Sequence, residues 1–295
     1  MSNRPAPARC NACPAMPTPE LNALSRLLLR LRNAVDFPLR QNLRLQRGGL
    51  KLYRNPEAEL FAGYNGPRRT AAQSLAARLI DQYHLQDFRA DSSPVNFREN
   101  LFYLHMLENA LELAQPAFGE TLQAADIGVS HWFYVQALAA GLRWWRCPTA
   151  QGRQLRLHGY EVDAYRVYAD FHSRYDHALA HMRAAPGISY CPREFAAQPG
   201  AFDLITLFFP FVFDKDHLRW GLPLGQFDPD RLMQSAWDSL KPGGLLLIVN
   251  QGADEHQAQG ELLRRLEITP CGEFRQDDLL FQYPYERYLW LALHP

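Results

Sequence analysis

The chain has 295 residues, 47% of them hydrophobic, which is enough for one large domain with a packed core, or for one domain plus an extension. Its formal net charge is zero, which excludes a strongly basic molecule that would attract nucleic acid over its whole surface. The charge is unevenly spread, because residues 1–54 hold ten Lys/Arg and two Asp/Glu, a balance of +8, and residues 55–295 balance it at −8. We expect the basic segment either to dock on the acidic body of the same chain or to meet a polyanionic partner such as RNA or a membrane surface.

The cysteines and the apolar runs exclude further classes. Five cysteines at wide spacings do not form a disulfide framework. Cys10 and Cys13 have a metal or redox spacing but lack a second pair of ligands, so no metal site is predicted. The sequence has no apolar run of about 18 residues and no apolar stretch ahead of a cleavage site, so we expect no membrane span, no secretory signal and a cytoplasmic protein.

The first part of the chain is predicted to be mainly helical. Residues 1–18 are rich in proline and read as a flexible leader, with Thr18 as a helix cap and Pro19 at the first helical position. The spacing of apolar residues predicts helices at 19–35, 68–84 and 95–115. Residues 43–53 alternate around two glycines and suggest a hairpin, and residues 61–67 have turn chemistry. We therefore divide the chain into a leader at 1–18, a helical extension or lid at 19–115, and an α/β domain at 116–295.

From residue 122 onward, short apolar runs alternate with helical segments. The runs lie at 122–129, 155–163, 188–191, 202–213 and 244–250, and a terminal strand pair is expected at 268–275 and 286–294. Helices fit at 132–142, 164–184, 229–240 and 254–267. This alternation is typical of a parallel sheet with helices on both faces.

Four motifs occur in order in this half of the chain. They are Ala-Ala-Asp126-Ile-Gly128-Val-Ser130-His-Trp, Leu-His-Gly159-Tyr-Glu161-Val-Asp163, Phe202-Asp203-Leu-Ile-Thr-Leu-Phe-Phe-Pro210, and Leu240-Lys241-Pro242-Gly243-Gly244. Their order and spacing resemble the class I S-adenosylmethionine (SAM) dependent methyltransferase family over about residues 97–295. The resemblance implies a Rossmann-like fold with a seven-stranded, mostly parallel sheet, an antiparallel C-terminal strand, and SAM as cofactor. A nicotinamide dehydrogenase is disfavoured, because the first strand lacks Gly-x-Gly-x-x-Gly.

The resemblance also assigns cofactor-binding residues. By this resemblance, Asp126 would organise the loop around the amino-acid part of SAM. Independently of the resemblance, a carboxylate at a strand end can simply hydrogen-bond the amides of the following turn. Family members have Asp-x-Gly-x-Gly-x-Gly here, and this chain keeps Gly128, has Ser130 at the second glycine, and has Phe133 or Tyr134 near the third. A side chain at such a position hinders backbone approach and positive φ, so a site that no longer binds SAM is the alternative.

The remaining cofactor contacts follow the next strands. Glu161 would accept both ribose hydroxyls, while Asp163 should point to the opposite face or cap a helix that starts at Ala164. The other candidates are His131 on a carboxylate, Glu194 or Phe195 at the adenine, and Phe209 after the fourth strand.

The chemistry is less constrained. Methyl transfer from a sulfonium needs alignment and exclusion of water, and it needs a general base only when the acceptor must lose a proton. His217 is a candidate base, with Asp214 or Asp216 to orient it, and a solvated loop is the alternative. Phe209-Pro210-Phe211 matches the motif of amide and adenine N-methyltransferases only in Pro-aromatic. We therefore expect a SAM-dependent methyltransferase acting on a small molecule, with two alternatives: a catalytically inactive binding or scaffold protein of this fold, and an RNA methyltransferase using the basic segment.

Overall fold

The computed structural model describes residues 20–183 and 185–295, and a single seven-stranded sheet forms its centre. The strands are β1 (Thr121–Ile127), β2 (Gln154–Tyr160), β3 (Ile188–Cys191), β4 (Phe202–Phe208), β5 (Leu240–Gln251), β6 (Gly272–Gln276) and β7 (Arg287–Leu293). Their order is β3-β2-β1-β4-β5-β7-β6, and only β7 runs antiparallel to its neighbours. This is the predicted Rossmann-like α/β fold, with its antiparallel strand near the C-terminus.

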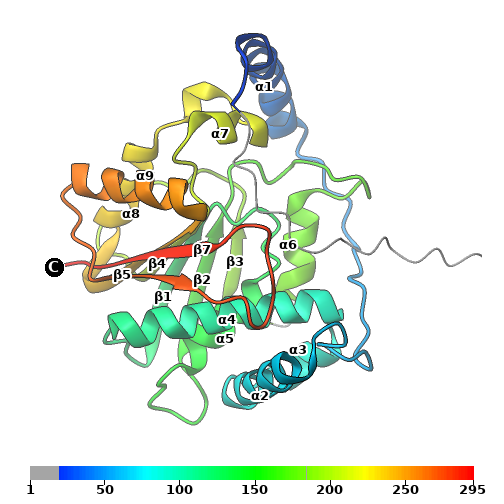
Figure 1. Ribbon diagram of the computed structural model, residues 1–295. Coiled ribbons are helices and arrows are strands. Elements are labelled where there is room, and N and C mark those ends of the chain that lie inside the picture. Colours follow the sequence, from blue (N-terminus) through cyan, green and yellow to red (C-terminus); the bar gives the residue numbers. More distant parts are fainter. Residues whose placement is uncertain (1–19, 184) are drawn as a thin grey trace, which may run out of the picture.

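Helices cover both faces of the sheet (Figure 1). On one face lie α4 (Pro94–Ala114), α5 (Val135–Trp144) and α6 (Arg174–Met182), and on the other lie α8 (Pro229–Asp238) and α9 (Gly252–Arg265). Successive residues of β5 serve the two faces in turn, because Leu245 and Leu247 join the first hydrophobic cluster and Leu246 joins the second. Strands buried on both faces explain the continuous apolar runs in the sequence.

The N-terminal helices are α1 (Ala23–Leu43), α2 (Gly66–Gln82) and α3 (Gln86–Ala90). The helix predicted at 19–35 instead begins at Ala23, because the side chain of Asn22 caps it by accepting the Ser25 N–H at 2.8 Å, and it continues through Pro38. Thr18, the leader and the Cys10/Cys13 pair lie outside the described residues. No helix in the described part of the chain is long and apolar enough to cross a membrane.

The hairpin predicted at 43–53 is wrong. The segment after α1 has no strand, and its backbone N–H groups at Arg47 and Gly48 donate to the Asp176 carboxylate instead of to a partner strand. Further along, α2 and α4 share one hydrophobic cluster with the sheet. The division of the chain at residue 115 stays a prediction.

The helix predicted at 164–184 begins ten residues later than expected, at Arg174. The reason is a capping box, in which the Ser173 hydroxyl accepts the Asp176 N–H and the Asp176 carboxylate accepts the Ser173 N–H. Asp163 therefore does not cap this helix. A short helix that the sequence analysis treated as loop, α7 (Asp214–Trp220), follows β4.

Candidate functional site

A cavity of about 1290 Å³ lies beyond the carboxyl ends of the strands. It is lined by the residues that follow β1, β2, β4 and β5, and by α7. The strand order reverses between β1 and β4, since the chain runs outward to β3 on one side and to β5 on the other. Ligands of open α/β sheets bind at such a reversal.

The loop between β1 and α5 has a left-handed backbone at three alternate residues. The φ angles are 80° at Gly128, 52° at Ser130 and 51° at Trp132. These positions have the spacing of the three glycines in Asp-x-Gly-x-Gly-x-Gly. The third position is thus Trp132, and its prediction at Phe133 or Tyr134 was wrong. The loop keeps a glycine-type conformation with two residues that ordinarily avoid it.

Trp132 is anchored behind the loop. Its side chain is fully buried, and its indole Nε1 donates to Asp126 Oδ2 at 2.7 Å. The ring covers Gly159 of β2 so closely that a Cβ there would lie 2.7 Å from it. A large side chain at position 132 therefore requires glycine at position 159.

The Asp126 carboxylate also helps to hold the loop from behind. Its Oδ1 accepts the Thr206 hydroxyl at 2.7 Å, and the residue is 0% exposed. Burial raises the pKa of Asp126 to about 7, against the opposing effect of the hydrogen bonds from Thr206 and Trp132. Asp126 is absent from the cavity wall and holds the turn from behind, but among the described residues it does so through the Trp132 indole and the Thr206 hydroxyl, not through the backbone amides of the turn that the simpler alternative expected.

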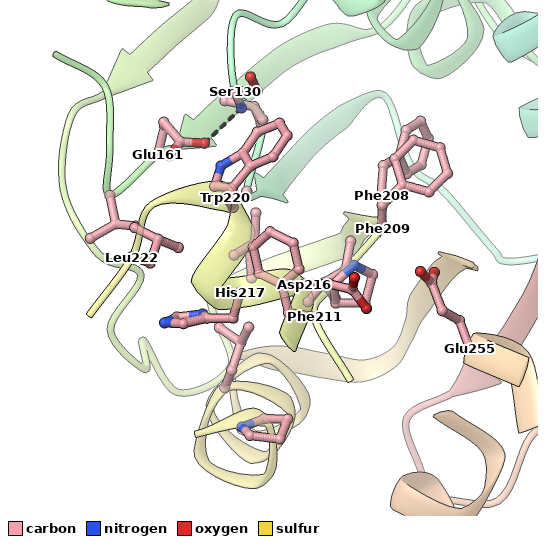
Figure 2. A pocket seen from close by; sticks show the side chains of 18 of the residues that line it. Ser130, Glu161, Phe208, Phe209, Phe211, Asp216, His217, Trp220, Leu222 and Glu255 are labelled. Carbon is pink, nitrogen blue, oxygen red and sulfur yellow. Dashed lines mark hydrogen bonds between the residues drawn. The ribbon is translucent and has the colours of Figure 1, made fainter. Parts of the chain in front are cut away.

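Glu161, directly after β2, reaches the loop from the cavity side (Figure 2). Its Oε2 accepts the Ser130 N–H at 2.7 Å, and its Oε1 accepts the Asp163 N–H at 2.8 Å. The Arg174 guanidinium lies 3.5 Å from Oε1. A carboxylate can accept about four hydrogen bonds, so Glu161 keeps acceptor capacity toward the cavity.

Asp163 faces elsewhere. It is fully buried and does not line the cavity. Its carboxylate accepts two hydrogen bonds from the guanidinium of Arg40 in α1, at 2.9 Å and 3.2 Å. Together with the ion pairs of Arg26 with Asp214 and of Arg54 with Asp91, this contact docks part of the basic segment on the chain's own body.

His131 lines the cavity between these groups. Its Nδ1 lies 3.1 Å from the Tyr168 hydroxyl, and its ring stacks on Phe133. Burial, followed by the charges of His177 and Arg174, lowers the pKa of His131 to about 4. The imidazole is therefore neutral near pH 7 and can offer a hydrogen bond to a ligand but no positive charge.

The adenine candidates differ in environment. Phe195 is buried, packs edge-on against Tyr160 with ring centres 5.0 Å apart, and lines the cavity. Glu194 also lines the cavity, but it is exposed, and its carboxylate accepts from Arg231 at 2.8 Å.

Aromatic rings form the wall that follows β4 (Figure 2). Phe209 has a φ of 62°, its N–H donates to Val249 O at 2.7 Å, and the Arg287 guanidinium carbon lies 4.7 Å from its ring centre. The ring centres of Phe211 and Trp220 lie 5.9 Å apart, and the two rings are tilted by 57° to each other. These rings give the cavity a broad apolar surface.

His217, the candidate base, sits against this wall. Its Nε2 donates to Pro223 O at 2.9 Å, its ring packs edge-on against Phe211, and burial lowers its pKa. Among residues 20–183 and 185–295, neither Asp214 nor Asp216 hydrogen-bonds to His217, and Asp214 is paired with Arg26. The site thus brings His217 to the cavity without the orienting carboxylate that was expected.

Glu255, in the first turn of α9, was not among the residues predicted from the sequence. Its Oε2 accepts the Gln251 N–H at 2.8 Å, and in Figure 2 its carboxylate points toward that of Asp216 from the opposite wall. Burial raises the pKa of Glu255 to about 7, and the negative charge of Asp216 adds to the rise. The available signal was its position, because acidic residues directly after a central strand lie at the ligand edge. No group of three or more potential metal-ligating side chains occurs in the described residues.

Comparisons with known proteins gave matches among solved structures alone. No family model and no curated protein matches the chain. A SAM-dependent methyltransferase from Aquifex aeolicus is 11% identical over 65% of this chain and 97% of that one, with a TM-score of 0.43. The N-methyltransferase NodS from Bradyrhizobium japonicum WM9 is 15% identical over 67% and 98%, with a TM-score of 0.42. A putative class I SAM-dependent methyltransferase from Listeria monocytogenes is 11% identical over 80% and 70%, with a TM-score of 0.45. At such identities and TM-scores, the function has to be argued from the site.

Proposed function

We propose that this chain binds SAM in the cavity beyond β1 and β2 and transfers its methyl group to an acceptor held against the aromatic wall. The observation that carries the proposal is the pairing of Glu161 with the left-handed loop at Gly128 and Ser130, at the edge where the strand order reverses. Glu161 accepts the two ribose hydroxyls with the lone pairs that its backbone contacts leave free. The cavity, about 1290 Å³, has room for a cofactor and a second small molecule.

The same proposal assigns the other cavity groups. Phe195 covers a face of the adenine, with Glu194 at its edge, and His131 donates a hydrogen bond to the carboxylate of SAM. Phe209, Phe211 and Trp220 hold the acceptor and keep water from the sulfonium, which is the main demand of this reaction.

Glu255 is the proposed acceptor-side base, in preference to His217. Its pKa of about 7 suits proton removal near neutral pH, whereas burial lowers the pKa of His217 and makes Nδ1, the nitrogen left unprotonated by the bond from Nε2 to Pro223 O, a weaker base. Asp216 stands across from it and favours an acceptor with a positive or hydrogen-bond-donating group.

Titration calorimetry with S-adenosylhomocysteine measures whether the affinity depends on Glu161, on the proposed cofactor side of the cavity, or on Glu255, on the proposed acceptor side. We expect saturable binding to the wild type and roughly 100-fold weaker binding to Glu161→Ala, because two charge-assisted hydrogen bonds together contribute about 3 kcal/mol or more. Glu255→Gln is the matched control, since it also alters a cavity carboxylate but should leave the affinity within about threefold.

Thermal unfolding of each variant checks that it is folded, and Glu161→Gln, which keeps one acceptor oxygen, should fall between wild type and Glu161→Ala. A folded wild type that binds neither SAM nor S-adenosylhomocysteine would leave the inactive binding protein as the function. Equal affinities of wild type and Glu161→Ala would refute the ribose assignment.

A further inference from the structure

Helix α1 is turned with most of its polar residues inward, together with Phe37. Asn33 of this helix is buried on its inner side, where its Nδ2 donates to Leu218 O at 2.8 Å and to Leu222 O at 3.0 Å. Arg40 and Arg26 extend the same inner side to Asp163 and Asp214. The helix is therefore attached to the body by hydrogen bonds and ion pairs, mostly around α7, and by the buried ring of Phe37, while most of its leucines take no part.

The apolar side of α1 faces outward. We call it the leucine face, and it consists of Leu24, Leu27, Leu28, Leu31, Val35 and Leu39, each of them more than half exposed. The residues recur three or four positions apart, so they form one continuous stripe along the helix. In Figure 1, α1 projects from the molecule next to α7, away from the sheet. A contiguous apolar stripe of this length on a folded protein marks an interaction surface.

Positive charge accompanies the leucine face. Arg30 and Arg32 flank Leu31 on its two sides, because each residue of a helix is rotated by about 100° from the one before it. Arg44, Arg47 and Lys51 follow the end of the helix and are exposed. In the described part of the chain, the side chains of Arg30, Arg44, Arg47 and Lys51 form no ion pair, and Arg32 pairs only with Asp36 of its own helix.

This combination fits one occupant, a lipid surface that carries negative charge. Leucines enter the boundary between headgroups and acyl chains, while arginines beside them stay among the anionic headgroups. A second copy of the chain fits less well, since a symmetric contact along α1 would bring its arginines against the same arginines. Nucleic acid would satisfy the charges and leave the leucines in water.

We propose that α1 lies on an anionic membrane surface with its leucine face buried in the lipid. The helix that binds the lipid is then also the helix that rests on α7, one wall of the cavity. The proposal does not depend on the methyltransferase function.

Flotation of the full-length protein with lipid vesicles tests this proposal. The wild type should bind vesicles of phosphatidylcholine mixed with phosphatidylserine, should bind pure phosphatidylcholine more weakly, and should be released by salt. Combining Leu28→Ser, Leu31→Ser and Val35→Ser should lower the partition coefficient at least about tenfold. The matched control combines Val95→Ser and Leu113→Ser, which alter exposed apolar residues of α4 and should change nothing.

A second variant tests the charge. Combining Arg30→Gln, Arg44→Gln and Arg47→Gln should weaken binding about fivefold for each arginine on mixed vesicles, and hardly at all on pure phosphatidylcholine. The proposal is overturned if the wild type does not float with mixed vesicles, or if the leucine variant floats as well as the wild type. A dimer in sedimentation velocity that the leucine variant dissociates would assign the face to a second copy, and RNA binding that survives the leucine variant would assign the charges to nucleic acid. Either result, together with a wild type that does not float, would overturn the proposal and name the other occupant.

Discussion

Two glycine-type turns of this molecule reach their backbone conformation in different ways. At the start of β5, Gly243 has a φ of 76°, and a Cβ on Gly244 would lie 2.8 Å from Lys241 O, so the geometry itself requires glycine. In the loop after β1, the same left-handed conformation occurs at Ser130 and Trp132. There it is imposed by three tertiary contacts: the burial of the Trp132 indole, its hydrogen bond to Asp126, and the hydrogen bond from the Ser130 N–H to Glu161. A departure from a glycine motif is thus no proof that the turn has been lost.

The comparison predicts that restoring glycine at position 132 will harm the protein. Trp132→Gly relieves the left-handed strain but removes a fully buried indole and leaves a cavity over Gly159. We expect a loss of about 3–5 kcal/mol in the free energy of unfolding, measured by urea denaturation. If Trp132→Gly is as stable as the wild type, the indole does not hold the loop, and the contrast between the two turns is wrong.

The same difference explains what the sequence could reveal. Runs such as Leu245 to Val249 are buried on both faces, so composition alone predicted the strands and their class. The two-residue spacing after Asp126 already gives Trp132 as the third loop position, which was miscounted, but its left-handed backbone depends on a contact with Gly159 on another strand that no local pattern encodes. The start of α6 was predicted ten residues too early, because the prediction followed the apolar spacing and overlooked the capping box at Ser173, which is the stronger signal of a helix start.

The candidate site was predictable to the same limited degree. Glu161 was found because it ends a strand beside the loop, and strand ends meet at one edge. Asp126 also ends a strand, yet its orientation away from the cavity depends on Thr206 and Trp132. Glu255 was missed although it follows the end of a central strand, because its position opposite Asp216 depends on where α9 and α7 lie around the cavity.

A second prediction concerns the carboxyl behind the loop. Because the pKa of Asp126 is raised to about 7, the folded protein keeps a proton that the unfolded chain releases near pH 4. Stability from this group is therefore full below about pH 4 and is lost as the pH rises toward 7. Asp126→Asn does not ionise, and its amide can still accept from Trp132 and donate to Thr206.

The difference in unfolding free energy between Asp126→Asn and wild type should shift in favour of the variant from pH 4 to pH 7, by at most about 1.4 kcal/mol per pH unit. Urea denaturation across this range measures it, and the histidines that titrate in the same range cancel in the difference. A difference independent of pH would show that Asp126 is ionised throughout, and that the bonds from Thr206 and Trp132 outweigh its burial.

The smallest effect is expected at Ser130, the other unusual position. Its backbone is already held on both sides, by Glu161 at the N–H and by the Tyr190 hydroxyl at the C=O, 2.7 Å in each case. Its own hydroxyl makes only long contacts, at 3.4 Å to His131 and to Tyr168. Ser130→Gly relieves left-handed strain of about 1 kcal/mol and increases the entropy of the unfolded chain by a similar amount, so the unfolding free energy should change by less than about 1 kcal/mol.

Ser130→Ala is the matched variant, because it removes the same hydroxyl but changes neither the strain nor, to the same extent, the entropy of the unfolded chain, so its stability should lie within about 1 kcal/mol of that of Ser130→Gly. The pair sharpens the contrast between the turns, since glycine would then be tolerated at position 130 and rejected at position 132. If Ser130→Gly lost about as much as Trp132→Gly, the serine hydroxyl would be an essential support of the loop. The loop would then depend on side chains at both positions, and Glu161 could not be regarded as the group that fixes its cavity side.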